Sequence, residues 1–326
     1  MKKNIKLMVI AAVALFAAAA NTCAGENQLR VLYWNIQNGM WADQQNDYFN
    51  FVRFVRSENP DVCIWCEAKS LYEDGTKEPL DKNRQYLPDG WPELAKRYGH
   101  KYTYIAAYRD NYPQVITSKY PIADVQRIYG EEPDSVVVHG AGWVRINVRD
   151  RDINFVCIHT YPQKYSPKYK NASDADKAMS SERHDGDAYR ATEVRYVCEH
   201  TIGTSPSASE EEWIFCGDFN SKSRVDNHFY KLEENDPAFQ CQDYILDNTP
   251  YIDVIGTMYP GVFCTSNRGG GRPDYFYCTK PLFDRIVEAY IVNTDWTRPV
   301  RASAPASAFY IPSDHRPVFV VFDLSK

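Results

Sequence analysis

The stretch at residues 213–220 reads Trp213-Ile214-Phe215-Cys216-Gly217-Asp218-Phe219-Asn220. Its first four residues are apolar and largely β-prone, which predicts a buried strand. The glycine and the two polar residues that follow are typical of a turn at the end of a strand. Asp218 and Asn220 are therefore expected at a strand end, where α/β folds place their ligands.

Further short apolar runs predict strands along the rest of the chain, at residues 29–36, 62–66, 102–108, 114–118, 143–148, 153–158, 275–278, 286–292 and 318–322. Apolar residues at helical spacing predict helices around residues 48–55 and 188–201. Strands outnumber helices, several are joined by short turns, and the runs are continuous enough for sheets that are buried on both faces. We therefore expect one α/β sandwich domain.

The N-terminus has the pattern of a targeting segment, with a lysine-rich end at residues 1–6 and an apolar run at 7–20. The apolar run is too short to span a bilayer comfortably. This predicts a signal peptide at residues 1–24, a mature domain at 25–326, and an exported protein that is periplasmic, extracellular or lipid-anchored at the cell surface. Ordinary cleavage near Cys23 and lipidation of Cys23 both remain open, and no other segment is long and apolar enough to cross a membrane.

The charge balance bears on the partners of the protein. The chain has a formal net charge of −6, and removal of residues 1–24 takes away three positive charges and no negative ones, which gives −9. An acidic protein has no general attraction for polyanions, so no strong nucleic-acid affinity is expected.

Eight of the nine cysteines follow the predicted signal peptide. Three of them lie in apolar runs and are expected to be inert buried thiols: Cys63, Cys157 and Cys216. Cys63 and Cys66 have the spacing of a metal or redox pair, but no second such pair exists, so neither role is expected. Cys264 and Cys278 flank a glycine-rich turn, and a disulfide between them remains open.

Polar residues that can bind metal or move protons recur at the ends of the predicted strands. They are Asn35, Glu67, His159, Asp218, Asn220, Asp274, Asp314 and His315. Carboxylate and amide oxygens suit Mg²⁺, Mn²⁺ or Ca²⁺, and the two histidines can donate or accept protons near neutral pH. Each residue alone has an ordinary structural explanation, so the order of these residues and the sequence around them are the stronger indication of function.

Seven segments in chain order resemble the endonuclease/exonuclease/phosphatase superfamily. They are residues 33–37 (Tyr-Trp-Asn-Ile-Gln), 60–67 (Pro-Asp-Val-Cys-Ile-Trp-Cys-Glu), 114–122 (Gln-Val-Ile-Thr-Ser-Lys-Tyr-Pro-Ile), 155–160 (Phe-Val-Cys-Ile-His-Thr), 217–220 (Gly-Asp-Phe-Asn), 272–276 (Arg-Pro-Asp-Tyr-Phe) and 313–318 (Ser-Asp-His-Arg-Pro-Val). The resemblance covers about residues 29–324. It implies a four-layer sandwich in which two facing, mainly antiparallel β-sheets are flanked by helices.

The resemblance also implies divalent-metal-dependent hydrolysis of a phosphate ester. Nucleic acid, phospholipid, and sugar or inositol phosphate all remain open as substrates, as do diester and monoester. The alternative is a non-catalytic surface-binding module that keeps the fold. Retention of the whole set of polar residues favours the enzyme.

The same resemblance implies a metal site that contains Asn35 and Glu67, with Asp314 as a further carboxylate. Glu67 is then the principal ligand, and Mg²⁺ is the expected ion, with Mn²⁺ or Ca²⁺ as substitutes.

It also implies roles for five catalytic residues. Asp218 is expected to orient or deprotonate the attacking water, and Asn220 to hold a phosphoryl oxygen. His315 is expected to contact the scissile phosphate, with its ring fixed by Asp274. His159 is expected to donate a hydrogen bond to the phosphate or the leaving group.

Two polar stretches, at residues 69–92 and 162–187, match no motif and are expected to set substrate choice. The second is long for an unstructured segment in a compact domain, which is typical of a functional loop or a disordered one. Its basic residues could grip a second phosphate or could simply be solvated: Lys164, Lys168, Lys170, Arg183 and His184.

Overall fold

The computed structural model describes residues 27–72, 78–79, 89–106, 112–130, 136–182, 185–293 and 312–325. The predicted signal peptide, with Cys23, lies outside these ranges, as do Arg183, His184 and much of the stretch at 69–92. Within the described residues, no helix is long and apolar enough to cross a membrane.

Two six-stranded sheets form the centre of the molecule. In spatial order, the first contains β11 (Ile286–Ile291), β12 (Val318–Asp323), β1 (Gln28–Asn35), β2 (Val62–Cys66), β4 (Val115–Ser118) and β3 (Tyr102–Ile105). The second contains β5 (Ile122–Ile128), β6 (Ala141–Val148), β7 (Arg151–His159), β8 (Glu212–Asp218), β10 (Asp274–Thr279) and β9 (Tyr251–Asp253). The pairs β1–β2 and β7–β8 are parallel, whereas the other neighbouring strands are antiparallel.

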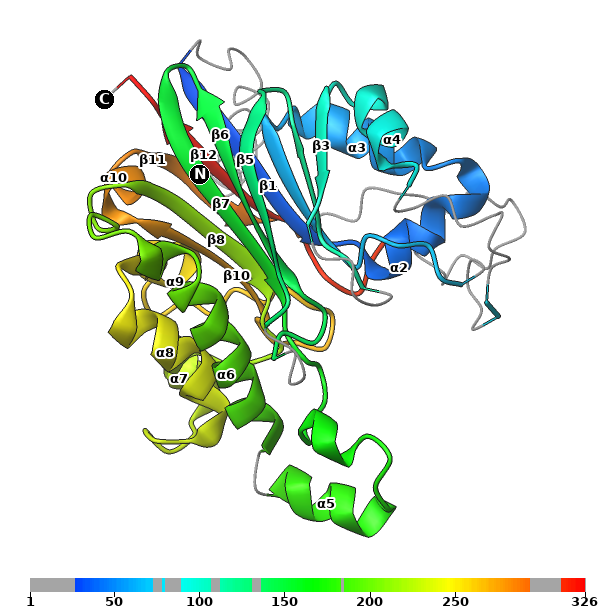
Figure 1. Ribbon diagram of the computed structural model, residues 1–326, viewed down its shortest axis with the longest axis vertical. Helices are drawn as coiled ribbons and strands as arrows, with labels where there is room; N and C mark the ends of the chain where they lie inside the picture. The colour runs from blue at the N-terminus through cyan, green and yellow to red at the C-terminus, as the bar shows by residue number, and fades with distance from the viewer. Residues whose placement is uncertain are drawn as a thin grey trace, which may run out of the picture.

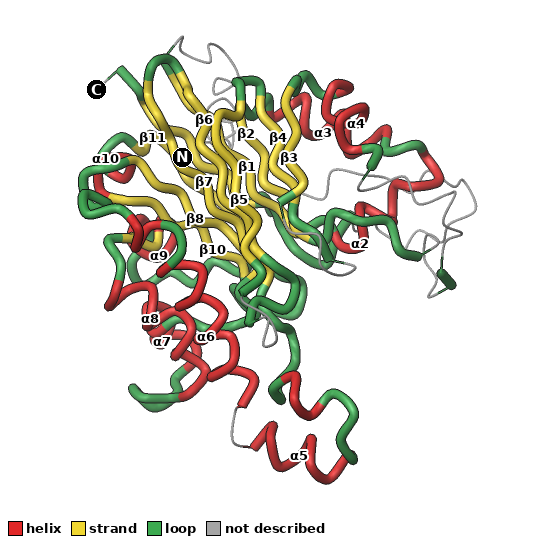
Figure 2. The backbone as a smooth tube through the Cα atoms, in the orientation of Figure 1, coloured by secondary structure: helices red, strands yellow, loops and turns green. Residues whose placement is uncertain are grey.

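Helices cover the outer faces of both sheets, as Figure 1 shows. The first sheet is covered by α3 (Phe49–Glu58) and α4 (Trp91–Arg97), and the second by α6 (Asp185–Glu199) and α8 (Gln240–Asn248). The other α-helices are α2 (Gln37–Met40), α5 (Asp174–Glu182), α7 (Asn227–Tyr230), α9 (Val254–Met258) and α10 (Lys280–Phe283). Segments of 3₁₀-helix lie at Trp41–Asn46, Pro167–Tyr169, Ile202–Thr204, Arg224–Asp226 and Pro237–Phe239. In Figure 2 the helices lie outside the strands, and this confirms the predicted four-layer sandwich.

Alternation of side chains along the strands explains the layers. Val31 and Tyr33 of β1 pack in the core between the two sheets, whereas Leu32 and Trp34 pack in the core under α3 and α4. Successive residues of a strand point to opposite faces, so a continuous apolar run supplies both cores. A third core lies between the second sheet and the helices α6 and α8. The central strands of both sheets are therefore buried on both faces, as the unbroken apolar runs predict, whereas the edge strands β3, β5 and β11 are partly exposed.

The stretch at residues 162–187 differs from the unstructured loop that the sequence predicts. It contains a 3₁₀ turn and the helix α5, which projects away from the sandwich (Figure 1). Ser173 accepts a hydrogen bond from the backbone N–H of Asp176, and Asp174 and Asp176 lie in the first turn, where acidic side chains stabilise a helix. Local capping therefore supports α5, and hydrophobic periodicity does not reveal it.

The cysteines of the described residues are all free thiols. Cys63 and Cys66 pack in different cores on opposite sides of β2, so they do not form a joint metal or redox site. Burial raises the pKa of the Cys157 thiol to about 12, as expected for an inert thiol. Cys264 and Cys278 are also free, so the disulfide left open by the sequence is not formed.

Gly217 is required by the contact between β7 and β8. A Cβ atom there would lie 2.5 Å from the carbonyl oxygen of Ile158, and the backbone would have to move. Gly217→Ala is therefore expected to lower the free energy of unfolding by about 2 kcal/mol, as overpacking does. Urea denaturation measures this loss, with Gly269→Ala as the control because its Cβ would meet no atom closer than 3.4 Å. Equal stability of the two variants would contradict this explanation of the glycine.

Candidate active site

The predicted polar residues meet where strands of the two sheets end. Asn35 ends β1 and Glu67 follows β2, which runs parallel to β1. In the second sheet His159 ends β7, Asp218 ends β8 and Asp274 begins the antiparallel β10. The register pairs Asp218 with His159 on one side and with Asp274 on the other. The fold therefore sets these three side chains next to one another at one rim.

The segment that carries Asp314 and His315 is anchored to β1. Ser313 Oγ donates to the carbonyl oxygen of Asn35 at 2.7 Å, and Trp34 Nε1 donates to the carbonyl oxygen of His315 at 3.0 Å. This anchoring brings a C-terminal histidine to the same rim as the N-terminal strand.

Glu67 is a half-buried carboxylate that accepts hydrogen bonds from two neutral donors. Asn35 Nδ2 donates to Glu67 Oε1 at 3.2 Å, and the backbone N–H of Asn38 donates to Oε2 at 3.1 Å. Burial raises the pKa of Glu67. Among the described residues, no basic side chain lies within ion-pair distance of this carboxylate. A half-buried carboxylate without an ion-pair partner is a suitable ligand for a hard cation.

Asn35 and Asp314 complete the surroundings of Glu67. Asn35 Nδ2 also donates to Asp218 Oδ2 at 3.0 Å, so one amide orients both carboxylates. The negative charge of Asp314 is a further factor that raises the pKa of Glu67. Glu67 has φ 54°, an uncommon backbone conformation for a residue with a side chain, and such strain is frequent at functional sites.

His315 and Asp274 form a hydrogen-bonded pair. His315 Nδ1 lies 2.8 Å from Asp274 Oδ2. Asp274 also accepts hydrogen bonds from the hydroxyls of Tyr33 at 2.9 Å and Ser266 at 2.7 Å, which fix its carboxylate. Burial lowers the pKa of His315, but the charges of Asp274 and Asp218 outweigh it, so the pKa lies well above its ordinary value. The ring is therefore held protonated and oriented.

Asp218 lies between the two histidines. Its Oδ2 is 3.7 Å from His159 Nε2 and 3.6 Å from His315 Nε2, and its Oδ1 accepts the backbone N–H of Asn220 at 3.0 Å. Burial raises its pKa to about 7. The side chain of Asn220 donates to the carbonyl oxygen of Thr160 at 3.1 Å. The arrangement is that of a carboxylate placed to accept a proton beside two hydrogen-bond donors.

Asp218, Asp274 and His315 also bring potential ligand atoms within 4.8 Å of one another, a spacing that can hold a metal ion. However, His315 Nδ1 and both oxygens of Asp274 already have hydrogen-bond partners. Each carboxylate oxygen of Glu67 accepts one hydrogen bond, whereas Asp274 Oδ2 has two partners.

The structure adds residues that sequence reasoning missed. Tyr33 and Ser266 bond Asp274, and the ring of His139 lies 4.6 Å from that of His159. Burial, followed by the charges of His139 and His315, lowers the pKa of His159, so its ring is neutral. Tyr33 could have been found from the sequence, because it lies two residues before Asn35 on the same face of a strand. Ser266 and His139 carry no such signal.

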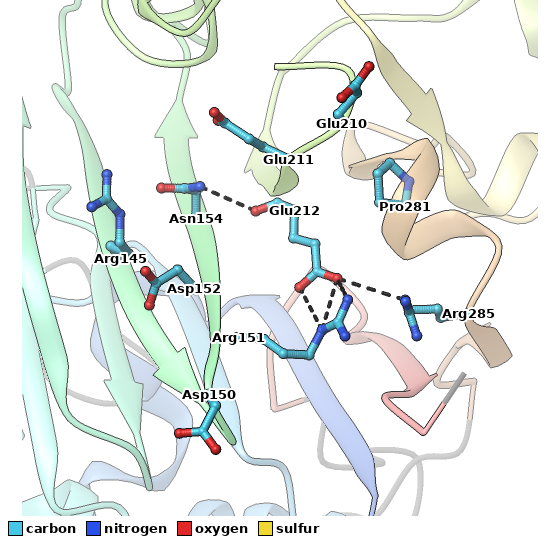
Figure 3. Close-up of a pocket in the computed structure, with 10 residues that line it drawn as sticks. All are labelled: Arg145, Asp150, Arg151, Asp152, Asn154, Glu210, Glu211, Glu212, Pro281 and Arg285. Atoms are coloured by element: carbon cyan, nitrogen blue, oxygen red, sulfur yellow. Dashed lines mark hydrogen bonds and ion pairs between the residues drawn. The ribbon is translucent and has the colours of Figure 1, made fainter. Parts of the chain in front are cut away.

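Two cavities differ in what they can do. One, of about 620 Å³, is lined by Asn220 and His315 and so opens on the residues described above. The other, of about 690 Å³, lies at the opposite ends of β7 and β8 (Figure 3). There the carboxylate of Glu212 is already committed to ion pairs with Arg151 and Arg285. We therefore place the chemistry at the first cavity.

Comparison with known families agrees with this geometry. The family described as the Endonuclease/Exonuclease/phosphatase family matches residues 32–315. This chain belongs to that family. Its members are hydrolases that act on phosphoester bonds. No curated protein matches the chain.

Solved structures of low sequence identity share the endonuclease/exonuclease/phosphatase fold. An AP endonuclease from Archaeoglobus fulgidus is 18% identical with a TM-score of 0.57, over 90% of this chain and 99% of that one. The human nocturnin catalytic domain with bound sulfate is 11% identical with a TM-score of 0.59, over 92% and 94%. A 3′-5′ exonuclease from Neisseria meningitidis is 17% identical with a TM-score of 0.56, over 90% and 100%.

Proposed function

We propose that this protein hydrolyses a phosphate ester with the help of a divalent cation, for which Mg²⁺ is the expected ion. The observation that carries the proposal is the half-buried carboxylate of Glu67, which has no ion-pair partner within 4 Å among the described residues, beside Asp218 and the His315–Asp274 pair. We also propose that the protein acts after export, which the lysine-rich and apolar N-terminus supports. Its acidity favours a small phosphate ester over a nucleic-acid duplex.

The residues present suit the proposed cation. Glu67 would hold it, Asp314 would add a second carboxylate nearby, and Asn35 would keep Glu67 in position through its amide. Once bound, the cation would neutralise charge on the phosphoryl group, which is the usual contribution of a metal to this reaction.

The side chains of the rim would carry the remaining steps. Asp218 would take the proton of the attacking water, because its Oδ2 is the acceptor that faces both histidines. His315, held protonated by Asp274, would donate from Nε2 to a phosphoryl oxygen, and Asn220 would donate to another. His159, as a neutral donor, would stabilise the phosphate or the leaving group. Donors fixed in advance in a buried site stabilise developing charge without reorganisation.

The test is hydrolysis of bis(p-nitrophenyl) phosphate and p-nitrophenyl phosphate by the purified mature protein. We expect turnover of at least one ester with Mg²⁺ or Mn²⁺, and its loss with a chelator. A folded protein that cleaves neither ester with either ion would favour the non-catalytic surface-binding module.

Glu67→Gln is expected to weaken Mn²⁺ binding by at least about tenfold and to lower activity, because it removes the anionic ligand and keeps the shape of the side chain. Calorimetric titration with Mn²⁺ measures the affinity without turnover, and the thermal midpoint checks the fold. Glu93→Gln is the control, since Glu93 is exposed on α4 and pairs with Lys96. Unchanged Mn²⁺ affinity in a folded Glu67→Gln variant would remove Glu67 from the metal site.

A further inference from the structure

The cavity of about 620 Å³ beside Asn220 and His315 has basic residues in its wall. Those side chains are Lys164, Arg190, Lys222 and Arg272. They come from separate parts of the chain, and folding brings them close to Asn220 and His315. Which of these charges can bind a ligand depends on whether each already has an acidic partner.

The two arginines are neutralised by buried carboxylates. Arg272 donates from Nε to Asp226 at 2.7 Å and from Nη1 and Nη2 to Asp253 at 2.9 and 2.6 Å. Arg190 donates from Nη2 to Asp187. These ion pairs hold the wall of the cavity together and leave no net positive charge to bind an anionic ligand.

The two lysines differ from the arginines. Across the described ranges, neither Lys164 nor Lys222 pairs with a carboxylate within 4 Å. Lys222 Nζ instead lies 5.0 Å from the centre of the Tyr230 ring, and Tyr230 is itself part of the wall. The cavity thus has two ammonium groups without acidic partners and one aromatic face.

The fold fixes the backbone that carries Lys164. Arg190 is 4% exposed, and its Nη1 donates to the carbonyl oxygens of Tyr161 at 2.9 Å and Gln163 at 2.8 Å. The N–H of Gly186 donates to the carbonyl oxygen of Lys164 at 2.9 Å. A Cβ at Gly186 would lie 2.1 Å from the carbonyl oxygen of Gln163, so only glycine allows this approach. The backbone of Lys164 is therefore fixed against α6, unlike that of a lysine on a free loop.

We propose that Lys164 and Lys222 bind a second anionic group of the substrate while the scissile phosphate lies at Asn220 and His315. This inference rests on the proposed function and narrows its substrate class. The preferred substrate is a phosphate ester whose alcohol part carries a further phosphate, with a ring between the two that contacts Tyr230. The cavity has the volume of a small-molecule site, so a sugar or one nucleoside fits it.

The second phosphate has two chemical sources, a sugar bisphosphate or a nucleoside bisphosphate. Inhibition of bis(p-nitrophenyl) phosphate hydrolysis distinguishes them through two matched pairs of inhibitors. One pair is fructose 6-phosphate and fructose 1,6-bisphosphate, and the other is thymidine 5′-monophosphate and thymidine 3′,5′-bisphosphate. In at least one pair we expect the bisphosphate to bind at least about tenfold more tightly than the monophosphate, because the second phosphate adds charge-assisted hydrogen bonds.

Three variants test the assignment to these lysines. Lys164→Gln and Lys222→Gln are each expected to reduce the preference for the bisphosphate several-fold. Gly186→Ala is expected to reduce it too, because it displaces Lys164 without removing its charge. Lys168→Gln is the matched control. Lys168 is exposed in the same stretch at residues 162–187 and lies near Asp185, but it is not part of the cavity wall.

The outcomes separate this inference from the proposed function. Calorimetric titration of the four inhibitors needs no turnover and measures the lysine site directly. A preference for bisphosphates that depends on the lysines supports the site even if no ester is hydrolysed, and absent hydrolysis would count against the proposed function alone. Equal affinity within both pairs, or a preference that survives both lysine substitutions, would overturn the inference.

Discussion

Asp218→Asn is expected to lower kcat for phosphate-ester hydrolysis by about 10³-fold, equivalent to about 4 kcal/mol in the barrier. The substitution keeps the shape of the side chain and removes its ability to accept a proton. Asp218 Oδ2 is the carboxylate oxygen that lies within 4 Å of both His159 and His315. Asn35 Nδ2 donates to this oxygen and Asn220 N donates to Oδ1, so the carboxylate is held in place. Loss of the base therefore affects the chemical step more than substrate binding.

The measurement is kcat at saturating Mg²⁺ with bis(p-nitrophenyl) phosphate, together with the thermal midpoint of each protein. Asp284→Asn is the control, because Asp284 is exposed and pairs with Lys280 on α10. The assignment of Asp218 as the base would be wrong if the folded variant kept kcat within tenfold of the parent.

His315→Ala and Asp274→Ala are each expected to lower kcat/KM by about 10²-fold or more. The kcat/KM of the double variant is expected to be no lower than that of the less active single variant. The 2.8 Å bond between His315 Nδ1 and Asp274 Oδ2 makes the two residues one unit, since Asp274 acts through the ring it orients. Once either member is gone, the other has little left to contribute.

A double-mutant cycle on kcat/KM measures this coupling. Tyr33→Phe is the matched control, because it removes one hydrogen bond to Asp274 and leaves the His315 pair intact, so its loss should stay below about tenfold. Additive losses for the two alanine substitutions would show that His315 and Asp274 act independently.

The fold was predictable where buried elements appear in the sequence as apolar runs. The strands β2 and β8 are buried along their whole length, and both appear as short apolar runs. The strand β5 was missed because it lies at a sheet edge and most of its residues are exposed. The helix α5 was missed because its capping residues, rather than an apolar face, support it.

The residues of the candidate site were likewise predictable at strand ends but not in loops. Asp218 and His159 were predictable because they end apolar strands, and the sheet register then makes them neighbours. Ser266 and His139 lie in loops, and only the fold brings them to Asp274 and His159. Among the basic residues noted at 162–187 that the structure describes, only Lys164 lines the cavity, and its partner Lys222 follows β8.

The central claim is that Glu67 holds a divalent cation beside a phosphate that Asn220 and His315 contact. Anomalous diffraction from a crystal grown with Mn²⁺ and inorganic phosphate tests it most directly, because it locates the metal without reference to turnover. We expect a Mn²⁺ peak at the carboxylate of Glu67, with phosphate oxygens within hydrogen-bond distance of Asn220 and His315. A peak held by Asp218, Asp274 and His315 with Glu67 uncoordinated, or no peak at this rim, would contradict it.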